Sequence, residues 1–204
     1  MIKNMTIEMY SELLASDEPT IGGGTAAAIS GAIGASLVMM VASLSVGKKK
    51  YAQHEEIFED VLGKMRDIQL ILLDKADEDK ASFEAVMQAF RLPRTNEDEV
   101  IVRNLAIEDA TKQATLVPMS VAMWAIEVAK SAIIVIEYGN VNARSDGLVG
   151  AQMALTSFIS AIYNVKTNLT TISDHGFVAE INEKIFAAQS QMNLFESMWK
   201  KFTG

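Results

Sequence analysis

The chain has 204 residues, half of them hydrophobic, with a formal net charge of −8, three prolines and no cysteine. The negative charge argues against nucleic acid as the main partner, because binding to phosphate backbones is driven by clustered cations. The lack of cysteine excludes disulfides, thiolate metal sites and a cysteine nucleophile, and makes the cytoplasm the default expected location. This length favours a single domain, 1–204, and the scarcity of alternating polar and apolar residues favours an all-α fold.

The first expected helix is short, and the second is central to the fold. Thr6 can cap a helix through about Ala15, with Tyr10 on its apolar face. A long helix with mostly small, uncharged residues then follows from near Gly24 to Val46, and Gly47 is expected to stop it. Because this helix is apolar on every side, we expect it to be buried in the bundle.

Both ends of the central helix carry features that suit an anion. Gly22, Gly23 and Gly24 stand where the helix begins, so its first free N–H groups can face a negatively charged ligand. At the other end, the lysines 48–50 place positive charge near the negative end of the helix dipole. Either end can also be an ordinary solvated cap.

The same central segment is long enough to cross a bilayer. Its glycines and serines lower its hydrophobicity, no second segment of this kind is expected, and the remaining helices read as amphipathic. A buried helix in a protein without a membrane partner is therefore the expectation.

A long amphipathic helix is expected from near Glu55 to about Leu92, where Pro93 forbids continuation. Its apolar stripe continues past Leu72 to Phe83, and Asp79 falls on it. A buried carboxylate there would have a raised pKa, which suits proton transfer at neutral pH. The alternative is that the helix rotates or kinks and that Asp79 is solvated.

The second half of the chain predicts three more helical segments. Thr95 is the expected cap of a helix to Val117, Pro118 either kinks it or starts a new one, and Met119 to Tyr138 continues it. Ser145 is the expected cap of the next helix, with Asp146 in its first turn, and this helix ends near Ile172. A last helix, Phe177 to Phe202, is expected to serve packing or dimerisation.

The helix after Ser145 has one unusual face. Beside an ordinary core stripe it carries small and amide residues in a second stripe, which ends in Asn164 and Asn168. This second stripe predicts either a close helix–helix contact with satisfied amides or one wall of a polar pocket.

Several kinds of chemistry lack support. His54 and His175 are too far apart in sequence for a helical metal pair, so no metal is expected. No G-x-S-x-G elbow is present, and the glycine triplet lacks the Walker spacing of a nucleotide-binding loop.

Six sequence motifs point to a family. PTIGGGTAAA, VGKKKY, DEDKASFEAVMQAF, VPMSVA, GNVNARSD and NVKTNL follow one another in the order and approximate spacing of the cyclodeaminase domain of formiminotransferase-cyclodeaminases, which the chain resembles from Tyr10 to Leu169. The same domain occurs alone in bacteria, often as a methenyltetrahydrofolate cyclohydrolase. Ile21 departs from the family, which usually has a second proline there.

The resemblance implies an all-α, up-and-down helical bundle that forms a homodimer and takes a tetrahydrofolate derivative as substrate, without a permanently bound cofactor. Hydrolytic opening of methenyltetrahydrofolate is the expected reaction, and ring closure of formiminotetrahydrofolate with loss of ammonia is the alternative. A helical folate-binding or interaction module without activity is a third interpretation, since fold alone does not establish chemistry.

Matching motif positions assign candidate roles. Asp79 is the expected general acid/base, and one of the lysines 48–50 is expected to hold the glutamate tail or assist proton transfer. The expected catalytic residues are Asp79, Lys48 and Asp146. The expected substrate-binding residues are Gly22, Gly23, Gly24, Thr25, Lys49, Lys50, Tyr51, Ser145, Asn164 and Asn168.

Overall fold

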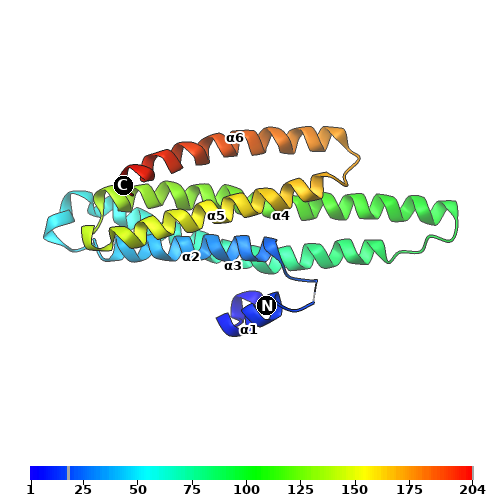
Figure 1. The fold of residues 1–204 in the computed structure, drawn as a ribbon, viewed down its shortest axis with the longest axis horizontal. Helices are drawn as coiled ribbons and strands as arrows, with labels where there is room; N and C mark the ends of the chain where they lie inside the picture. Colours follow the sequence, from blue (N-terminus) through cyan, green and yellow to red (C-terminus); the bar gives the residue numbers. More distant parts are fainter. Residues whose placement is uncertain (18, 204) are drawn as a thin grey trace.

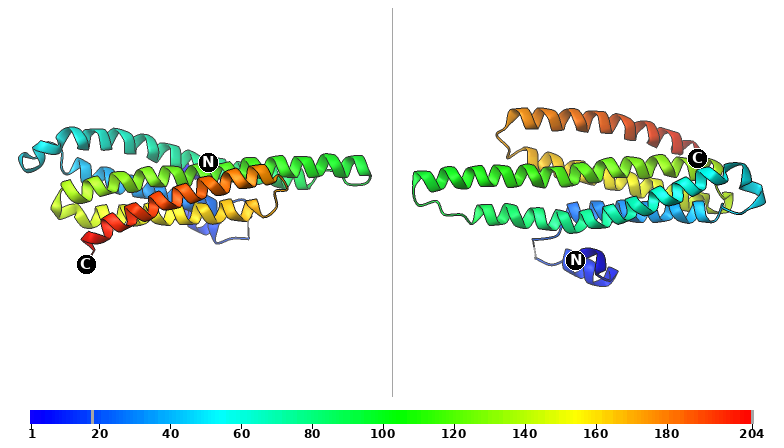
Figure 2. Two further views of the ribbon diagram at one scale, coloured as in Figure 1. Left: turned by 90° about the horizontal axis from the view of Figure 1, so that it is seen from above. Right: turned by 180° about the vertical axis from the view of Figure 1, so that it is seen from behind.

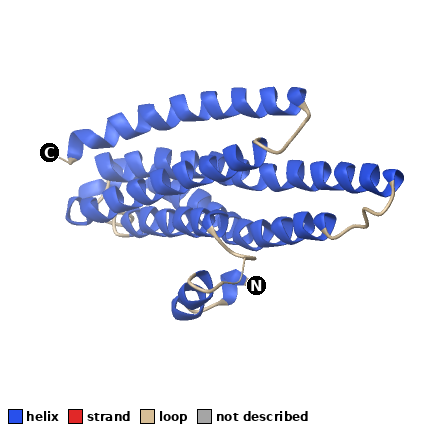
Figure 3. Cartoon of the chain, turned by 45° about the vertical axis from the view of Figure 1, so that its right-hand side comes forward, coloured by secondary structure: helices blue, strands red, loops and turns tan. Residues whose placement is uncertain are grey.

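The computed structural model describes residues 1–17 and 19–203, and within this part of the chain all regular structure is helical (Figure 3). The expected all-α class is therefore confirmed. The described residues form six α-helices: α1 (Ile7–Leu14), α2 (Gly23–Ser43), α3 (Glu55–Phe90), α4 (Glu97–Tyr138), α5 (Arg144–Leu169) and α6 (His175–Trp199). Four 3₁₀ turns join or flank them: η1 (Ile2–Asn4), η2 (Lys49–His54), η3 (Val141–Ala143) and η4 (Lys200–Phe202).

Helices α2 to α5 run up and down and form the body of the bundle (Figure 1). The most extensive contacts join α2 to α3 and α5, and α4 to α3 and α5, so the four helices form a closed square. Helix α6 packs on α4 and α5, while α1 lies beside the bundle body (Figure 2), with Tyr10 and Leu13 packed against the core. The α3–α4 hairpin extends beyond the other helices at one end (Figure 1).

The small residues of α2 permit a close approach to α5. A Cβ atom on Gly34 would lie 3.0 Å from the Gly150 carbonyl oxygen, and one on Gly31 would lie 2.8 Å from Ser157 Oγ. Ser30 Oγ also donates a hydrogen bond to the Met153 carbonyl oxygen at 2.9 Å. One half of the small-residue stripe on α5 is thus a helix–helix contact, as one of the two expectations had it.

More than one helix is long and apolar enough to cross a membrane by length and composition alone. Such stretches occur in α2, in α4 and in Val141–Leu169, so the expectation of only one such segment was wrong. In the bundle, 61%, 67% and 50% of these three stretches are buried. The last two were missed because charged residues near their ends make the whole helices look amphipathic.

Two expected helix caps are corrected. The cap of α4 is Asn96, whose Oδ1 accepts from the Glu99 amide at 2.9 Å, while Thr95 donates its own amide and hydroxyl to the Glu99 carboxylate. Ser145 is not a cap, because η3 runs directly into α5 and places Ser145 inside its first turn. The local pattern of polar residues was read correctly, but the helix register was off by one or two positions.

Two other boundaries differ from expectation. Helix α4 is continuous through Pro118. Helix α6 begins at His175, two residues earlier than predicted, because the Asp174 carboxylate accepts hydrogen bonds from the amides of Gly176 and Phe177 at 3.0 and 3.1 Å. Asp174 is therefore the N-cap of α6.

Candidate active site

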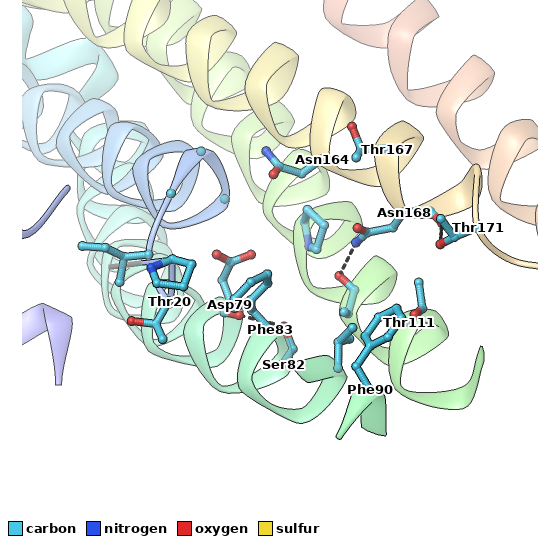
Figure 4. A pocket seen from close by; sticks show the side chains of 18 residues that line it. Thr20, Asp79, Ser82, Phe83, Phe90, Thr111, Asn164, Thr167, Asn168 and Thr171 are labelled. Atoms are coloured by element: carbon cyan, nitrogen blue, oxygen red, sulfur yellow. Dashed lines mark hydrogen bonds between the residues drawn. The ribbon is translucent and has the colours of Figure 1, made fainter. Parts of the chain in front are cut away.

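A pocket of about 350 Å³ opens where the start of α2 meets α3, α4 and α5 (Figure 4). Its walls combine the glycine turn, polar side chains of α4 and α5, and apolar side chains of α3. The residues that line it are Pro19, Thr20, Ile21, Gly22, Gly23, Gly24, Asp79, Ser82, Phe83, Val86, Phe90, Thr111, Ala114, Pro118, Asn164, Thr167, Asn168 and Thr171. Six of the residues predicted to form the site thus share one cavity: Gly22, Gly23, Gly24, Asp79, Asn164 and Asn168.

Asp79 lies where the apolar stripe of α3 passes from the bundle core to the pocket wall. Before it, residues such as Met65 and Leu72 are buried in the bundle core. After it, Phe83 and Phe90 line the pocket instead. Helix α3 runs unbroken through this position, so Asp79 is on the apolar face and partly buried, as the first of the two interpretations required.

Burial raises the pKa of Asp79 to about 6, and a hydrogen bond from the Thr25 backbone amide acts in the opposite direction. Removal from water disfavours the charged form of a carboxyl group. A carboxyl group with this pKa is mostly ionised at pH 7 and still takes up a proton readily, which suits general acid/base catalysis.

Close approach explains why a glycine stands at position 24. A Cβ atom there would lie 2.2 to 2.5 Å from the carboxylate atoms of Asp79. Among the described residues, positive φ occurs at Gly47 and not in the glycine turn, where Gly22 has φ of −170°. The structure thus requires a glycine at position 24 for close approach to the Asp79 side chain and not for its backbone conformation.

A hydrogen-bonded chain holds the turn around Asp79. Thr25 Oγ1 donates to the Gly22 carbonyl oxygen at 2.8 Å, and Tyr10 Oη lies 3.2 Å from the same Oγ1. A hydroxyl has one hydrogen to donate, so Tyr10 is the donor in the second contact. Burial raises the pKa of Tyr10, and the negative charge of Asp79 adds to this effect. The sequence predicted Tyr10 only as an apolar-face residue, although a hydroxyl on that face was a usable signal.

The amide of Asn168 compensates for Pro118. Proline has no N–H, so the Ala114 carbonyl oxygen, four residues earlier in α4, lacks its helical donor. Asn168 Nδ2 donates to that oxygen at 3.1 Å (Figure 4). Asn164 Nδ2 donates in a similar way to the Ser160 carbonyl oxygen at 2.8 Å.

Both amides therefore offer their carbonyl oxygens to the pocket. Their Nδ2 groups are engaged with backbone, and no described residue donates to either Oδ1 atom. These two acceptors suit a ligand that presents N–H groups. The small-residue stripe of α5 thus serves both expected roles, a helix contact along one half and a pocket wall along the other.

The remaining predicted residues lie at the opposite end of the bundle. Helix α2 has 21 residues and therefore spans about 30 Å between the glycine turn and the lysines 48–50. Ser145 and Asp146 lie at this far end as well, in the first turn of α5. A single chain does not bring these residues to Asp79, so their roles in binding or catalysis stay predictions.

At this far end the two motifs VGKKKY and GNVNARSD contact each other. Tyr51 Oη accepts a hydrogen bond from the Val141 amide at 3.1 Å, and Lys50 Nζ lies 5.3 Å from the centre of the Tyr51 ring. The Asn140 amide donates to Ser45 Oγ at 2.8 Å. These contacts tie the end of α2 to the end of α4.

Other pocket residues were not among the predicted ones. Phe83 lies on the α3 face and was read as core, while Thr20 and Thr111 carried no recognisable signal in sequence. Within the part of the chain that the structure describes, no three His, Asp or Glu side chains gather closely enough to hold a metal ion.

The chain is similar to several known proteins. Residues 6–187 match the family described as formiminotransferase-cyclodeaminase. A methenyltetrahydrofolate cyclohydrolase from Methylorubrum extorquens is 42% identical over 180 residues, which are 88% of this chain and 86% of that protein.

Longer relatives and a solved structure extend the comparison. Formimidoyltransferase-cyclodeaminase from Gallus gallus is 30% identical over 164 residues, which are 80% of this chain but only 30% of that protein. The crystal structure of formiminotetrahydrofolate cyclodeaminase from Thermotoga maritima superimposes with a TM-score of 0.89 at 29% identity, covering 98% of this chain and 96% of that one. The chain therefore belongs to the formiminotransferase-cyclodeaminase family.

Proposed function

We propose that this protein is a methenyltetrahydrofolate cyclohydrolase, which opens the methenyl ring with water to give formyltetrahydrofolate. The observation that carries the proposal is the Asp79 carboxyl group, held in the pocket with a pKa of about 6. The 42% identity to a protein of that name, over most of both chains, supports it.

The chemistry needs one group that accepts and returns a proton. The ionised Asp79 carboxylate takes a proton from a water molecule while the water oxygen adds to the methenyl carbon. This carbon is flanked by two nitrogens. The protonated Asp79 then gives this proton to one of the two nitrogens, and the bond from that nitrogen to carbon breaks. The hydroxyl on the carbon releases its proton to solvent, which leaves the formyl group on the other nitrogen. A negative carboxylate also attracts the cationic methenyl ring before water adds.

The polar side of the pocket suits the pterin ring. The Oδ1 atoms of Asn164 and Asn168 can accept hydrogen bonds from pterin N–H groups, and the ring of Phe83 offers an apolar surface. These contacts orient the substrate so that its reacting carbon reaches Asp79.

Formiminotetrahydrofolate cyclodeaminase is the second candidate. It is favoured by the close structural similarity to the Thermotoga maritima protein of that name. Both reactions pass through a tetrahedral carbon between two nitrogens, so the same acid/base group serves either.

Absorbance of methenyltetrahydrofolate tests the proposal. Purified protein should consume the added compound, and it should not accumulate methenyltetrahydrofolate from formiminotetrahydrofolate. Accumulation with release of ammonia would instead establish the cyclodeaminase, and inactivity with both compounds despite folate binding would establish a non-catalytic module.

The variant Asp79→Asn tests the assigned group. We expect turnover to fall by about 10²- to 10⁴-fold, the range that a positioned acid/base group contributes, with folate binding retained. Exposed Asp67, on the same helix, provides the control variant Asp67→Asn. Near-normal turnover in Asp79→Asn would remove Asp79 from the mechanism.

We also propose that the protein acts in the cytoplasm as a homodimer and needs no permanently bound cofactor. Support for the dimer comes from exposed apolar side chains on neighbouring helices, since Tyr163 of α5 and Phe186 and Leu194 of α6 are 66%, 76% and 58% exposed. Sedimentation analysis of the purified protein should give twice the mass of the chain, and a monomer at all concentrations would contradict this.

A further inference from the structure

The pocket has a neighbour on the adjacent face of α3. This second groove shares Pro19, Thr20 and Phe83 with the pocket, and it ends at Gln88 and Arg91. At about 100° per residue, positions 79, 83 and 90 lie on one side of α3, and positions 84, 88 and 91 lie roughly a third of a turn further round. Phe83 and the Pro19–Thr20 segment thus form the boundary between the two cavities.

The groove is apolar near the pocket and cationic at its far end. Pro19, Phe83 and Met87 provide its apolar surface. Arg91 is exposed and forms no ion pair with any described residue. Glu84, the one acidic residue among the described residues that line the groove, lies 3.4 Å from Lys80. The far end therefore presents one uncompensated positive charge.

A tetrahydrofolate has the complementary pattern. Beyond the reacting carbon it continues as an aromatic aminobenzoyl ring and ends in a glutamate with two carboxylates. A protein of net charge −8 repels such an anion at long range, so a local cation is needed where the tail lies. The lysines at positions 48–50 of the same chain are about 30 Å away along α2.

We propose that this groove is the subsite for the aminobenzoylglutamate tail, with Arg91 binding a glutamate carboxylate and Gln88 assisting it. The proposal rests on the proposed folate substrate. The aminobenzoyl ring packs on Phe83 and Met87 as the tail passes the Pro19–Thr20 segment. The guanidinium group then meets a carboxylate, a pairing that its planar donors favour.

Removal of the Arg91 charge should weaken binding only of substrates that carry the glutamate tail. We expect Arg91→Ala to raise the KM for methenyltetrahydrofolate about tenfold with little change in kcat, because a hydrogen bond to a charged group is lost. The KM for methenyltetrahydropteroate, which lacks the glutamate, should not change. Arg91→Lys, which keeps the charge, should restore part of the affinity, and Arg66→Ala, an exposed arginine elsewhere on α3, should behave as wild type.

Binding measurements separate this proposal from the proposed reaction. Calorimetry with tetrahydrofolate and tetrahydropteroate should show tighter binding of the first, and Arg91→Ala should abolish the difference whether or not the protein turns over methenyltetrahydrofolate. An equal loss for both ligands, or no loss for either, would overturn the subsite. The subsite would also be overturned if replacing the lysines at 48–50 abolished the difference in affinity while Arg91→Ala left it unchanged. The tail would then be held by lysines of a second copy.

Discussion

The two ends of α2 look alike in sequence and differ in structure. Both carry glycine and both were expected to bind an anion. At the first end the backbone closes on a carboxyl group, since Gly24 leaves no room for a side chain beside Asp79. At the second end Gly47, with φ of +71°, lies in a turn where an added Cβ would meet no atom within 4 Å. A glycine thus indicates a site when a functional group occupies the space of the missing side chain, as at Gly24. It indicates only a turn when no atom lies there, as at Gly47.

The largest expected effect comes from filling that space. Gly24→Ala places a methyl group against the Asp79 carboxylate, so the carboxylate must move, and we expect turnover to fall on the order of 10²-fold because misplacement of a catalytic group is costly. Gly63→Ala is the matched control, since its Cβ meets nothing within 4 Å on the exposed side of α3. Steady-state kinetics on both variants checks this, and normal turnover in Gly24→Ala would mean that the carboxylate position does not matter.

The buried Asp79 carboxyl group should also lower the stability of the folded protein at neutral pH. The lysine end of α2 has no buried charged group of this kind among the described residues. The pKa of Asp79 is raised from 3.8 to about 6, so the folded protein binds this proton more tightly than the unfolded chain does. The folded protein is therefore most stable, as far as this group is concerned, below about pH 4, and it loses up to about 3 kcal/mol of stability as the pH rises through 6.

Asp79→Asn should therefore raise the free energy of unfolding at pH 7.5 by up to that amount and leave it nearly unchanged at pH 4. Urea unfolding at the two pH values measures the difference. A variant that is destabilised equally at both would show that the carboxylate is not strained in the folded protein.

A smaller effect is expected from the hydroxyl that holds the glycine turn. Tyr10→Phe removes the donor to Thr25 Oγ1, and a typical hydrogen bond contributes about 1 kcal/mol, so we expect kcat to fall about three- to tenfold. The acid limb of the pH–rate profile should move to higher pH, because a looser Thr25 amide stabilises the Asp79 carboxylate less. Tyr138→Phe, at the far end of α4, is the control, and a fall in kcat without this shift would indicate a purely structural role for Tyr10.

The smallest effect belongs to the lysine end. Replacing the lysines at 48–50 together with alanine should change turnover less than about twofold if one chain forms the whole site, since they lie about 30 Å from the glycine turn. A loss of more than tenfold in a variant of unchanged stability would instead place these lysines at the site of a partner copy. The comparison between the two ends would then no longer hold.

Much of the fold could be predicted from the sequence, because long amphipathic stripes and proline and glycine breaks determine helices locally. Asp79 could be found for the same reason, as a charge on an apolar stripe. The caps of α4 and α5 were misplaced because Thr95 and Asn96, or Ser145 and the residues before it, compete for the same role and only three-dimensional register decides between them. The sequence did not show which of the predicted site residues lie together. The two ends of α2 are separated by the length of the helix, and sequence motifs at those ends do not indicate whether they belong to one site.

The bond between Asn168 and the Ala114 carbonyl oxygen has an evolutionary consequence. The carbonyl needs an outside donor only because Pro118 removes the one within its helix. A related sequence that replaces the proline restores the helical N–H donor, so the Asn168 amide is no longer needed. A sequence that loses the amide first leaves the Ala114 carbonyl oxygen without a donor beside the pocket. Positions 118 and 168, 50 residues apart, should therefore change together among related sequences, with the proline changing first.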